Sequence, residues 1–450
     1  MKFNMTCCMP LLLAIVGNVA CAANPDDSAS AANIADKPKN IIMLVGDGMG
    51  PAYTTAYRYY ADDKNTAEVE QTVFDRLLVG TASTYPHQDS GYITDSAAGA
   101  TALSTGVKTY NGAIAVDSDK KPLLTVLEWA RQKGLKTGVA VTSHINHATP
   151  ASYVTHNESR RNYAQIADSY YDEKINGKFK LDVMLGGGWE FFIREDRNLV
   201  EEFKRAGYQY VDKLEQLATV AAGQPLLGLF GEEGMPWALD SKNKQRLPML
   251  TEAAIKQLEN EQGFFLLIEA SQIDWAGHSN DIAGAMAEMH DLSLTLEFLE
   301  KYLEQHSDTL LVLTADHSTG GLTIGANGEY RWDPEWLTML KGSTKEIAKQ
   351  LATAKDITAV AADLLGFELT DAEKKQLAEI ESSDPLVFYS AIKTLLDGRS
   401  NTGWTTTGHT GVDVQVFAKG KGAEIFAGYQ DNTQLAERIF TLLGRIPFER

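Results

Sequence analysis

Side chains of the types that can bind metal ions lie near five short apolar segments of this sequence. They are Asp47; His144, His147, Thr149 and His156; Glu269, Asp274 and His278; Asp316 and His317; and His409. Asp274 and His278 are four residues apart, so on a helix they share one face. Carboxylates and imidazoles without thiolates suit Zn²⁺, and sites richer in carboxylate, hydroxyl and water suit Mg²⁺. One such side chain is more often a helix cap or a buried polar group, but five sets together predict a site for several metal ions.

A serine in the segment TDSAAGATA, residues 94–102, is the natural reactive partner of such a site. Small residues follow Ser96, so a helix beginning there would present backbone N–H groups and a positive dipole end to an anion. A serine hydroxyl is a weak nucleophile unless a base or a metal ion stabilises its alkoxide. Asp95 could orient an arginine beside a bound phosphate. Considered alone, Ser96 could equally be a helix N-cap.

These side chains require a scaffold that brings distant segments together. The five apolar segments are residues 41–45, 139–141, 264–268, 310–313 and 414–417. Their continuous apolar character is typical of strands covered on both faces, as in a parallel sheet. Between them lie segments such as 123–134 and 283–305, with apolar residues at three- and four-residue steps typical of helices. This alternation predicts one large doubly wound α/β domain with a mostly parallel sheet, in which ligands bind beyond the carboxyl ends of the strands.

Residues 40–450 are predicted to form this single domain, which a helical and charged segment at 321–402 interrupts. Within that segment, Ser343 with Glu346 and Thr370 with Glu373 have the spacing of helix capping boxes. We expect a helical insertion packed on the main sheet. A lid over a substrate pocket is the alternative.

The composition limits the kinds of partner. The hydrophobic content of 44% and the charged content of 22% are those of an ordinary globular protein. The net charge of −19 argues against nucleic acid or an anionic membrane surface as a partner, because both require clustered Lys and Arg. An anionic substrate would need a local concentration of positive charge, and no transmembrane segment is predicted.

The first residues have the pattern of a secretory signal peptide. A lysine precedes a short apolar run and small residues, which predicts a signal peptide at 1–22, a flexible arm at 23–39, and a periplasmic or secreted protein. Acylation of Cys21, as in a lipoprotein, is the less favoured alternative because Asn18 stands where leucine is usual. All three cysteines, Cys7, Cys8 and Cys21, lie in this segment. Cleavage after Ala22 would therefore exclude disulfides, thiolate metal sites and a cysteine nucleophile.

Six motifs, in this order, resemble those of the alkaline phosphatase family. They are VGDGMG, TDSAAGATA, HATPA with a downstream arginine, EASQIDWAGH, TADHSTGG and GHTG, and they span residues 40–417. The resemblance implies the alkaline phosphatase fold and the hydrolysis of phosphate monoesters to an alcohol and inorganic phosphate. It further implies a phosphoserine intermediate, two Zn²⁺ ions, one Mg²⁺ ion and a homodimer.

The resemblance also implies a role for each matched residue. Ser96 would be the nucleophile, and Arg160, oriented by Asp95, would bind two phosphate oxygens. One zinc ion, which activates water and stabilises the leaving oxygen, would be held by Asp274, His278 and His409. The second zinc ion, which binds the Ser96 alkoxide, would be held by Asp47, Asp316 and His317. Magnesium would be held by Asp47, Thr149 and Glu269.

Two positions near these residues depart from the best-known bacterial pattern of the family. His147 stands where that pattern has Asp, and Trp275 stands where it has Lys. An imidazole anchors magnesium-bound waters less well than a carboxylate does, and the missing lysine removes a positive charge. We therefore expect weaker retention of phosphate and easier product release. His144, His156 and Arg161 match no role and are interpreted as structural or surface groups.

Three alternatives are weighed against this interpretation. A sulfatase would require a Cys/Ser-x-Pro-x-Arg motif, which residues 95–99 lack. A phosphodiesterase shares the metal scaffold, but a third metal site at Thr149 and Glu269 would crowd the second ester group. A periplasmic phosphate- or metal-binding protein would not need an activated serine.

Overall fold

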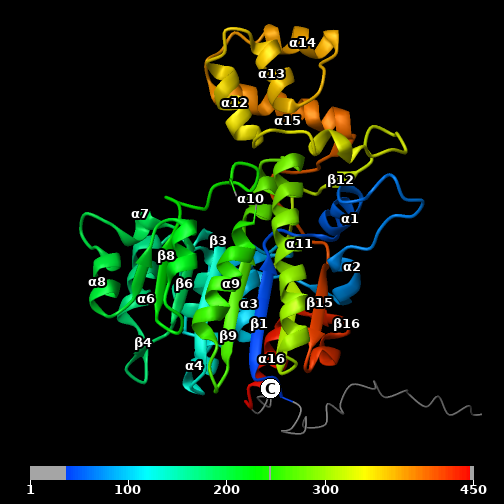
Figure 1. Cartoon of the computed structure of the whole chain (residues 1–450). Coiled ribbons are helices and arrows are strands. Elements are labelled where there is room, and N and C mark those ends of the chain that lie inside the picture. The colour runs from blue at the N-terminus through cyan, green and yellow to red at the C-terminus, as the bar shows by residue number, and fades with distance from the viewer. Residues whose placement is uncertain (1–36, 243–244, 446–450) are drawn as a thin grey trace, which may run out of the picture.

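A ten-stranded sheet forms the centre of the molecule (Figure 1). The computed structural model describes residues 37–242 and 245–445, so the predicted signal peptide and residues 23–36 of the predicted arm lie outside the described residues. From one edge to the other the strands are β16 (Gly428–Asp431), β2 (Leu78–Ser83), β15 (Val414–Gly420), β10 (Thr309–Thr314), β1 (Asn40–Gly46), β9 (Phe264–Ala270), β3 (Lys136–His144), β6 (Val183–Gly187), β8 (Leu226–Leu229) and β7 (Gln209–Val211).

The sheet is mostly parallel, as the continuous apolar segments predict. β1 pairs in parallel with β10 on one side and with β9 on the other, and every residue of these three strands is buried. β15 is the exception, because it runs antiparallel to both β10 and β2. All five predicted apolar segments are strands, and the predicted fold class is confirmed.

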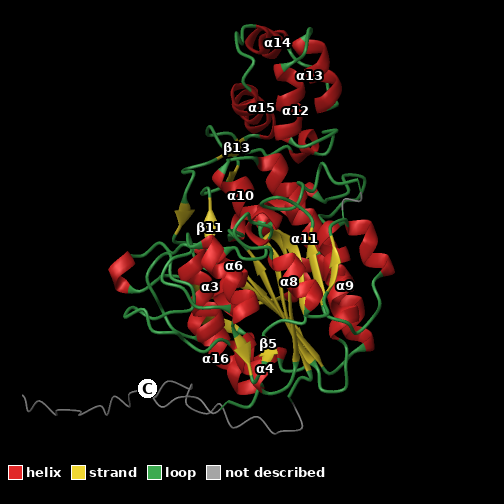
Figure 2. Ribbon diagram, turned by 90° about the vertical axis from the view of Figure 1, so that its left-hand side faces the viewer, coloured by secondary structure: helices red, strands yellow, loops and turns green. Residues whose placement is uncertain are grey.

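Helices cover both faces of the sheet (Figure 2). One layer contains α9 (Arg246–Leu258) and α11 (Ile282–Gln305), and the other contains α3 (Ser96–Thr105), α4 (Val126–Gln132), α5 (Ala148–Val154) and α16 (Asn432–Leu442). α4 and α11 occupy the segments that the helical periodicity predicts. α11 begins where the side chain of its N-cap, Asp281, accepts a hydrogen bond from the backbone N–H of Gly284.

The segment 321–402 contains a lobe of four helices that stands beyond the carboxyl ends of the central strands (Figure 1). The helices are α12 (Thr344–Ala352), α13 (Ile357–Leu365), α14 (Asp371–Ala378) and α15 (Pro385–Ser400). Ser343 and Thr370 cap α12 and α14, as their spacing from Glu346 and Glu373 predicts. The four helices pack on one another, and α15 also contacts α11.

No helix within residues 37–242 and 245–445 combines the length and the apolar character that crossing a membrane requires.

Candidate active site

The candidate site residues lie at the carboxyl ends of four adjacent strands of the sheet. Asp47 follows β1, Glu269 lies near the end of β9, and Asp316 follows β10. The fourth strand, β3, leads into α5, which contains Thr149 and has His147 as its N-cap. Because parallel strands end at the same edge, residues that are far apart in the chain become neighbours.

The most deeply buried group contains Asp47, Asp316 and His317, whose side chains are fully buried. Nε2 of His317 lies 3.5 Å from Oδ1 of Asp47 and 3.2 Å from Oδ2 of Asp316. Two backbone N–H groups, those of Gly48 and of His317 itself, donate to Oδ1 of Asp316 and fix that carboxylate. These three residues are close enough to bind one metal ion together.

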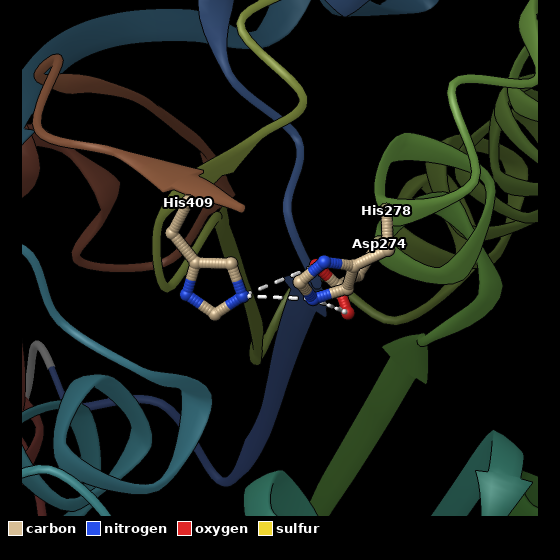
Figure 3. Close-up of side chains that lie close together, drawn as sticks. All are labelled: Asp274, His278 and His409. Carbon is tan, nitrogen blue, oxygen red and sulfur yellow. Dashed lines mark hydrogen bonds and ion pairs between the residues drawn. The ribbon is translucent and has the colours of Figure 1, made fainter. Parts of the chain in front are cut away.

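A second group, nearer the surface, contains Asp274, His278 and His409 (Figure 3). Asp274 and His278 lie on α10 (Gln272–His278), one helical turn apart as predicted. The two imidazoles face each other with their Nε2 atoms 3.0 Å apart, and Oδ2 of Asp274 lies 3.4 Å from Nε2 of His278. Backbone carbonyls hold each ring by its other nitrogen: Nδ1 of His278 lies 2.6 Å from the oxygen of Thr407, and Nδ1 of His409 lies 2.8 Å from that of Thr94. Both Nε2 atoms are thereby directed at a common point, as in metal sites with oriented imidazoles.

The third group joins Asp47 to His147 and Glu269. Both carboxylate oxygens of Asp47, Oε1 of Glu269, Nδ1 of His147 and the hydroxyl of Thr149 are buried without a hydrogen-bond partner among the described residues. Buried polar atoms of native proteins almost always have a partner, so this cluster indicates a ligand. The carboxylate and hydroxyl oxygens of this group fit a divalent cation.

The electrostatics of the three groups also favour bound cations. Burial, together with the neighbouring carboxylates Asp274 and Glu269, raises the pKa of Asp316 to about 8. Burial raises the pKa of Glu269 to about 7, and burial with the charge of Asp316 raises that of Asp47 well above its ordinary value. Metal ions would stabilise the ionised forms, since opposite charge close to a buried carboxylate lowers its pKa.

Ser96 is the first residue of α3, and its hydroxyl oxygen lies 3.1 Å from Nε2 of His317. The N-cap is Asp95, whose Oδ1 accepts hydrogen bonds from the backbone N–H groups of Ala98 and Gly112, both at 3.0 Å. A Cβ atom on Gly99 would lie only 3.0 Å from the backbone oxygen of Asp316. The small residues after Ser96 therefore allow α3 to approach the strand end that carries Asp316 closely.

Arg160 contacts two predicted site residues, Asp95 and His147. Its Nη1 donates to Oδ2 of Asp95 at 3.0 Å, and its Nη2 lies 3.2 Å from Nε2 of His147. Burial opposes the charge of this guanidinium, but Asp95 outweighs that effect and the pKa of Arg160 is raised above its ordinary value. A permanently charged side chain is thus held facing the start of α3.

The two residues that depart from the family pattern lie against each other. The rings of His147 and Trp275 are 6.3 Å apart. A Cβ atom on Gly234 would lie 2.6 Å from the Trp275 ring, so the loop at Gly234 covers the indole. Burial, with the charges of His144 and Arg160, lowers the pKa of His147 well below its ordinary value.

The other candidate histidines lie outside the three groups. His144 packs against His147 and Phe191, with ring centroids 5.0 Å and 4.8 Å apart. His156 bonds to the carboxylate of Glu128, and Arg161 is exposed.

Sequence reasoning did not identify Thr319 as part of the site. Its hydroxyl donates to Oδ1 of Asp274 at 2.5 Å and lies 3.2 Å from Nδ1 of His317, so it joins two of the candidate metal-binding groups. Its position two residues after His317, at the same strand end, is the signal that could have revealed it.

The fold agrees with the comparisons with known proteins. A family model described as alkaline phosphatase matches residues 38–444, so the chain belongs to the alkaline phosphatase family. Alkaline phosphatase 3 of Bacillus subtilis (strain 168) is 48% identical over 414 residues, which cover 91% of this chain and 89% of that protein. The chain is thus an enzyme of a family of phosphomonoesterases.

Two solved structures illustrate the likeness. The cold-active alkaline phosphatase from Shewanella sp. is 51% identical and has a TM-score of 0.85, with 90% of this chain and all of that chain covered. A mutant of the alkaline phosphatase from the Antarctic bacterium TAB5, with a histidine replaced by glutamate and Mg bound in the M3 site, is 26% identical. Its TM-score is 0.68, and 91% of this chain and 99% of that chain are covered.

Proposed function

We propose that this enzyme hydrolyses phosphate monoesters to an alcohol and inorganic phosphate through a phosphoserine at Ser96. The observation that carries the proposal is the position of the Ser96 hydroxyl. It is buried at the start of a helix, 3.1 Å from Nε2 of His317 and within the cluster of metal-binding side chains. A serine that merely capped the helix would not need these neighbours, and the cap is Asp95.

The residues of the three groups would hold two zinc ions and one magnesium ion. Asp274, His278 and His409 would hold one zinc ion, Asp47, Asp316, His317 and the Ser96 oxygen the second, and Asp47, Thr149 and Glu269 the magnesium. When bound, these ions supply positive charge that lowers the pKa of coordinated hydroxyl groups and water and stabilises the entering and leaving oxygens. They and Arg160 outweigh the four site carboxylates, so a phosphate dianion is attracted to a protein that is acidic overall.

The protein's own groups position the phosphate. Arg160 would donate to two phosphate oxygens, and Asp95 restrains the guanidinium by accepting a hydrogen bond from its Nη1. The backbone N–H groups at the start of α3 face the same phosphate with the positive end of the helix dipole. These groups would hold the phosphate near the Ser96 hydroxyl before the attack, which removes much of the entropic cost of the step.

Departure of the phosphate is favoured by His147 and Trp275. Neither side chain supplies a positive charge here, because His147 has a lowered pKa and Trp275 is uncharged. A related alkaline phosphatase, the TAB5 mutant in which a histidine is replaced by glutamate, has Mg bound in its M3 site. Product release is then expected to be easier in this enzyme than in members with Asp and Lys.

The hydrolysis of two esters of one alcohol tests the proposal. Purified protein is assayed at alkaline pH with p-nitrophenyl phosphate and with bis-p-nitrophenyl phosphate, before and after treatment with a chelator. We expect the monoester to be strongly preferred, the chelator to abolish turnover, and Zn²⁺ with Mg²⁺ to restore it. A preference for the diester, or full activity after complete removal of metal, would contradict the proposal.

Export and dimerisation are further parts of the proposal. They are supported by the signal-peptide pattern at 1–22 and by the family resemblance. Mass spectrometry of the mature N-terminus and light scattering on the purified protein test them. Retention of residues 1–22 or a monomeric mass would contradict them.

A further inference from the structure

The insertion contacts the loop that follows His278. Nζ of Lys393, on α15, donates to the backbone oxygen of Ser279, the residue next to His278. Tyr389, one turn earlier on α15, donates to Oδ2 of Asp281 at 3.1 Å. The Asp281 carboxylate also caps α11, so α15 is attached to the short loop between α10 and α11 at two points.

A second contact reaches the segment that carries His409. The indole N–H of Trp404 donates to Oδ1 of Asp397 on α15 at 3.1 Å. The Trp404 ring packs directly on Gly320, where a Cβ atom would lie 2.7 Å from the ring and 2.8 Å from the backbone oxygen of Gly277. Gly320 also has a φ of +80°, so a side chain at this position would be strained as well as crowded. Asp397 thereby holds Trp404 at the meeting point of three segments.

Backbone hydrogen bonds connect Gly320 to the segment that positions His278 and His409. The oxygen of Gly320 accepts from the N–H groups of Thr405 and Thr406 at 3.2 Å, and its own N–H donates to Gly408 at 2.8 Å. The next residue, His409, is therefore fixed relative to Gly320. The oxygen of Thr407, in the same segment, lies 2.6 Å from Nδ1 of His278.

These histidines need such support more than the other imidazole ligand does. His317 is fully buried at the end of a central strand, whereas the side chain of His278 is 43% exposed and ends a short helix. His409 lies in a two-residue strand, β14 (His409–Thr410), outside the main sheet. The sheet itself therefore does not orient either ring.

We propose that α15 is a strut that positions His278 and His409, with Lys393 and Asp397 as its positioning residues. The insertion would then be required for the geometry of the Asp274, His278 and His409 site, rather than only covering a pocket. This inference rests on the proposed function, because it takes these three residues as zinc ligands.

The test measures the rate at which the zinc-loaded enzyme releases zinc to a chromogenic chelator. Asp397→Leu removes the acceptor for Trp404, and Lys393→Met removes the donor to Ser279. Both are expected to release part of their zinc at least about tenfold faster than wild type, the usual scale for losing a group that orients a metal ligand. Asp397→Asn keeps an acceptor for the indole and is expected to behave like wild type.

Glu373→Gln is the matched control within the same lobe. Glu373 pairs with Arg399 on α15 at 2.6 Å and does not contact the loops of His278 or His409, so its loss is expected to leave zinc release unchanged. If Asp397→Leu does not fold, Trp404→Phe, which removes the N–H donor together with part of the ring over Gly320, replaces it and is expected to accelerate release.

The outcomes separate this inference from the proposed function. Faster zinc release in the two variants, with Asp397→Asn and Glu373→Gln unchanged, would support the strut. A lower melting temperature with zinc release at the wild-type rate would show that α15 only stabilises the lobe, and would overturn the inference alone. A wild-type protein that retains no zinc would contradict both.

Discussion

The hydroxyl oxygen of Ser96 lies 3.1 Å from Nε2 of His317, although the two residues are 221 positions apart in the chain. This contact places the first residue of α3 against the end of β10. Because both side chains are buried, the serine is withheld from bulk water and is exposed only to the groups of the site.

Replacing Ser96 with alanine is expected to lower kcat for p-nitrophenyl phosphate by at least about 10³-fold, as loss of a nucleophile does in other hydrolases. The metal content of the variant is expected to remain close to wild type, because the other ligands of each group are intact. Steady-state kinetics and elemental analysis on the same sample check both parts. Wild-type turnover by a fully metal-loaded variant would contradict the assignment.

Replacing Arg160 with alanine is expected to weaken inhibition by inorganic phosphate about 30-fold. This corresponds to the loss of about 2 kcal/mol of charge-assisted hydrogen bonding. The adjacent Arg161→Ala is the control, since Arg161 is exposed and carries the same charge. Equal effects of the two substitutions would show that only general electrostatics is involved.

The double substitution His147→Asp and Trp275→Lys is expected to tighten phosphate inhibition severalfold and to lower kcat where product release limits it. The carboxylate would hold magnesium-bound water and the lysine would add positive charge beside the phosphate. Tyr330→Lys, which adds a lysine at a fully exposed position, is the control for the charge introduced by Trp275→Lys. If inorganic phosphate inhibits the double variant no more strongly than wild type, His147 and Trp275 do not account for easier product release.

Much of this site could be predicted from the sequence because its residues follow strands. Asp47 and Asp316 lie within three residues of the ends of continuous apolar segments, and parallel strands place such residues at the same end of the sheet. The roles of single residues came instead from the family resemblance. The antiparallel direction of β15 could not be predicted, because the apolar character of a short strand does not indicate the direction in which it runs in the sheet. The edge strand β16 was missed because it is short, and three of its four residues, Gly428, Gln430 and Asp431, are not apolar.

The contact between Asp397 and Trp404 could not be predicted from local sequence patterns. A helix position and a loop tryptophan seven residues later have no distinctive spacing, and only the return of the chain from the insertion brings them together. The same holds for Thr319 and Asp274, which are 45 residues apart.

A buried group of charged side chains, Glu128, His156 and Lys180, predicts that the stability of the fold depends on pH. Burial alone would raise the pKa of Glu128, but hydrogen bonding to His156 and the charge of Lys180 lower it to about 2. Nζ of Lys180, whose side chain is 5% exposed, lies 2.8 Å from Oε1 of Glu128. Because the folded pKa lies below the ordinary value of 4.5, the stabilisation is complete above about pH 5 and is lost as the pH falls towards 2.

Glu128→Gln is therefore expected to lower the free energy of unfolding by about 3 kcal/mol at neutral pH and by progressively less as the pH falls. Urea unfolding of both proteins at several pH values measures the difference. Metal release in acid affects both proteins, so their difference isolates the network. A difference that is constant with pH, or that grows in acid, would contradict the assignment.

Trapping the covalent intermediate tests the central claim most directly. The metal-loaded enzyme is incubated with inorganic phosphate, quenched in acid and digested, and the peptide that contains Ser96 is examined by mass spectrometry, with Ser96→Ala treated identically. We predict one phosphoryl group on Ser96 of the wild type and none on the variant. An unmodified Ser96 peptide from wild-type enzyme that turns over p-nitrophenyl phosphate in the same preparation would contradict the phosphoserine mechanism.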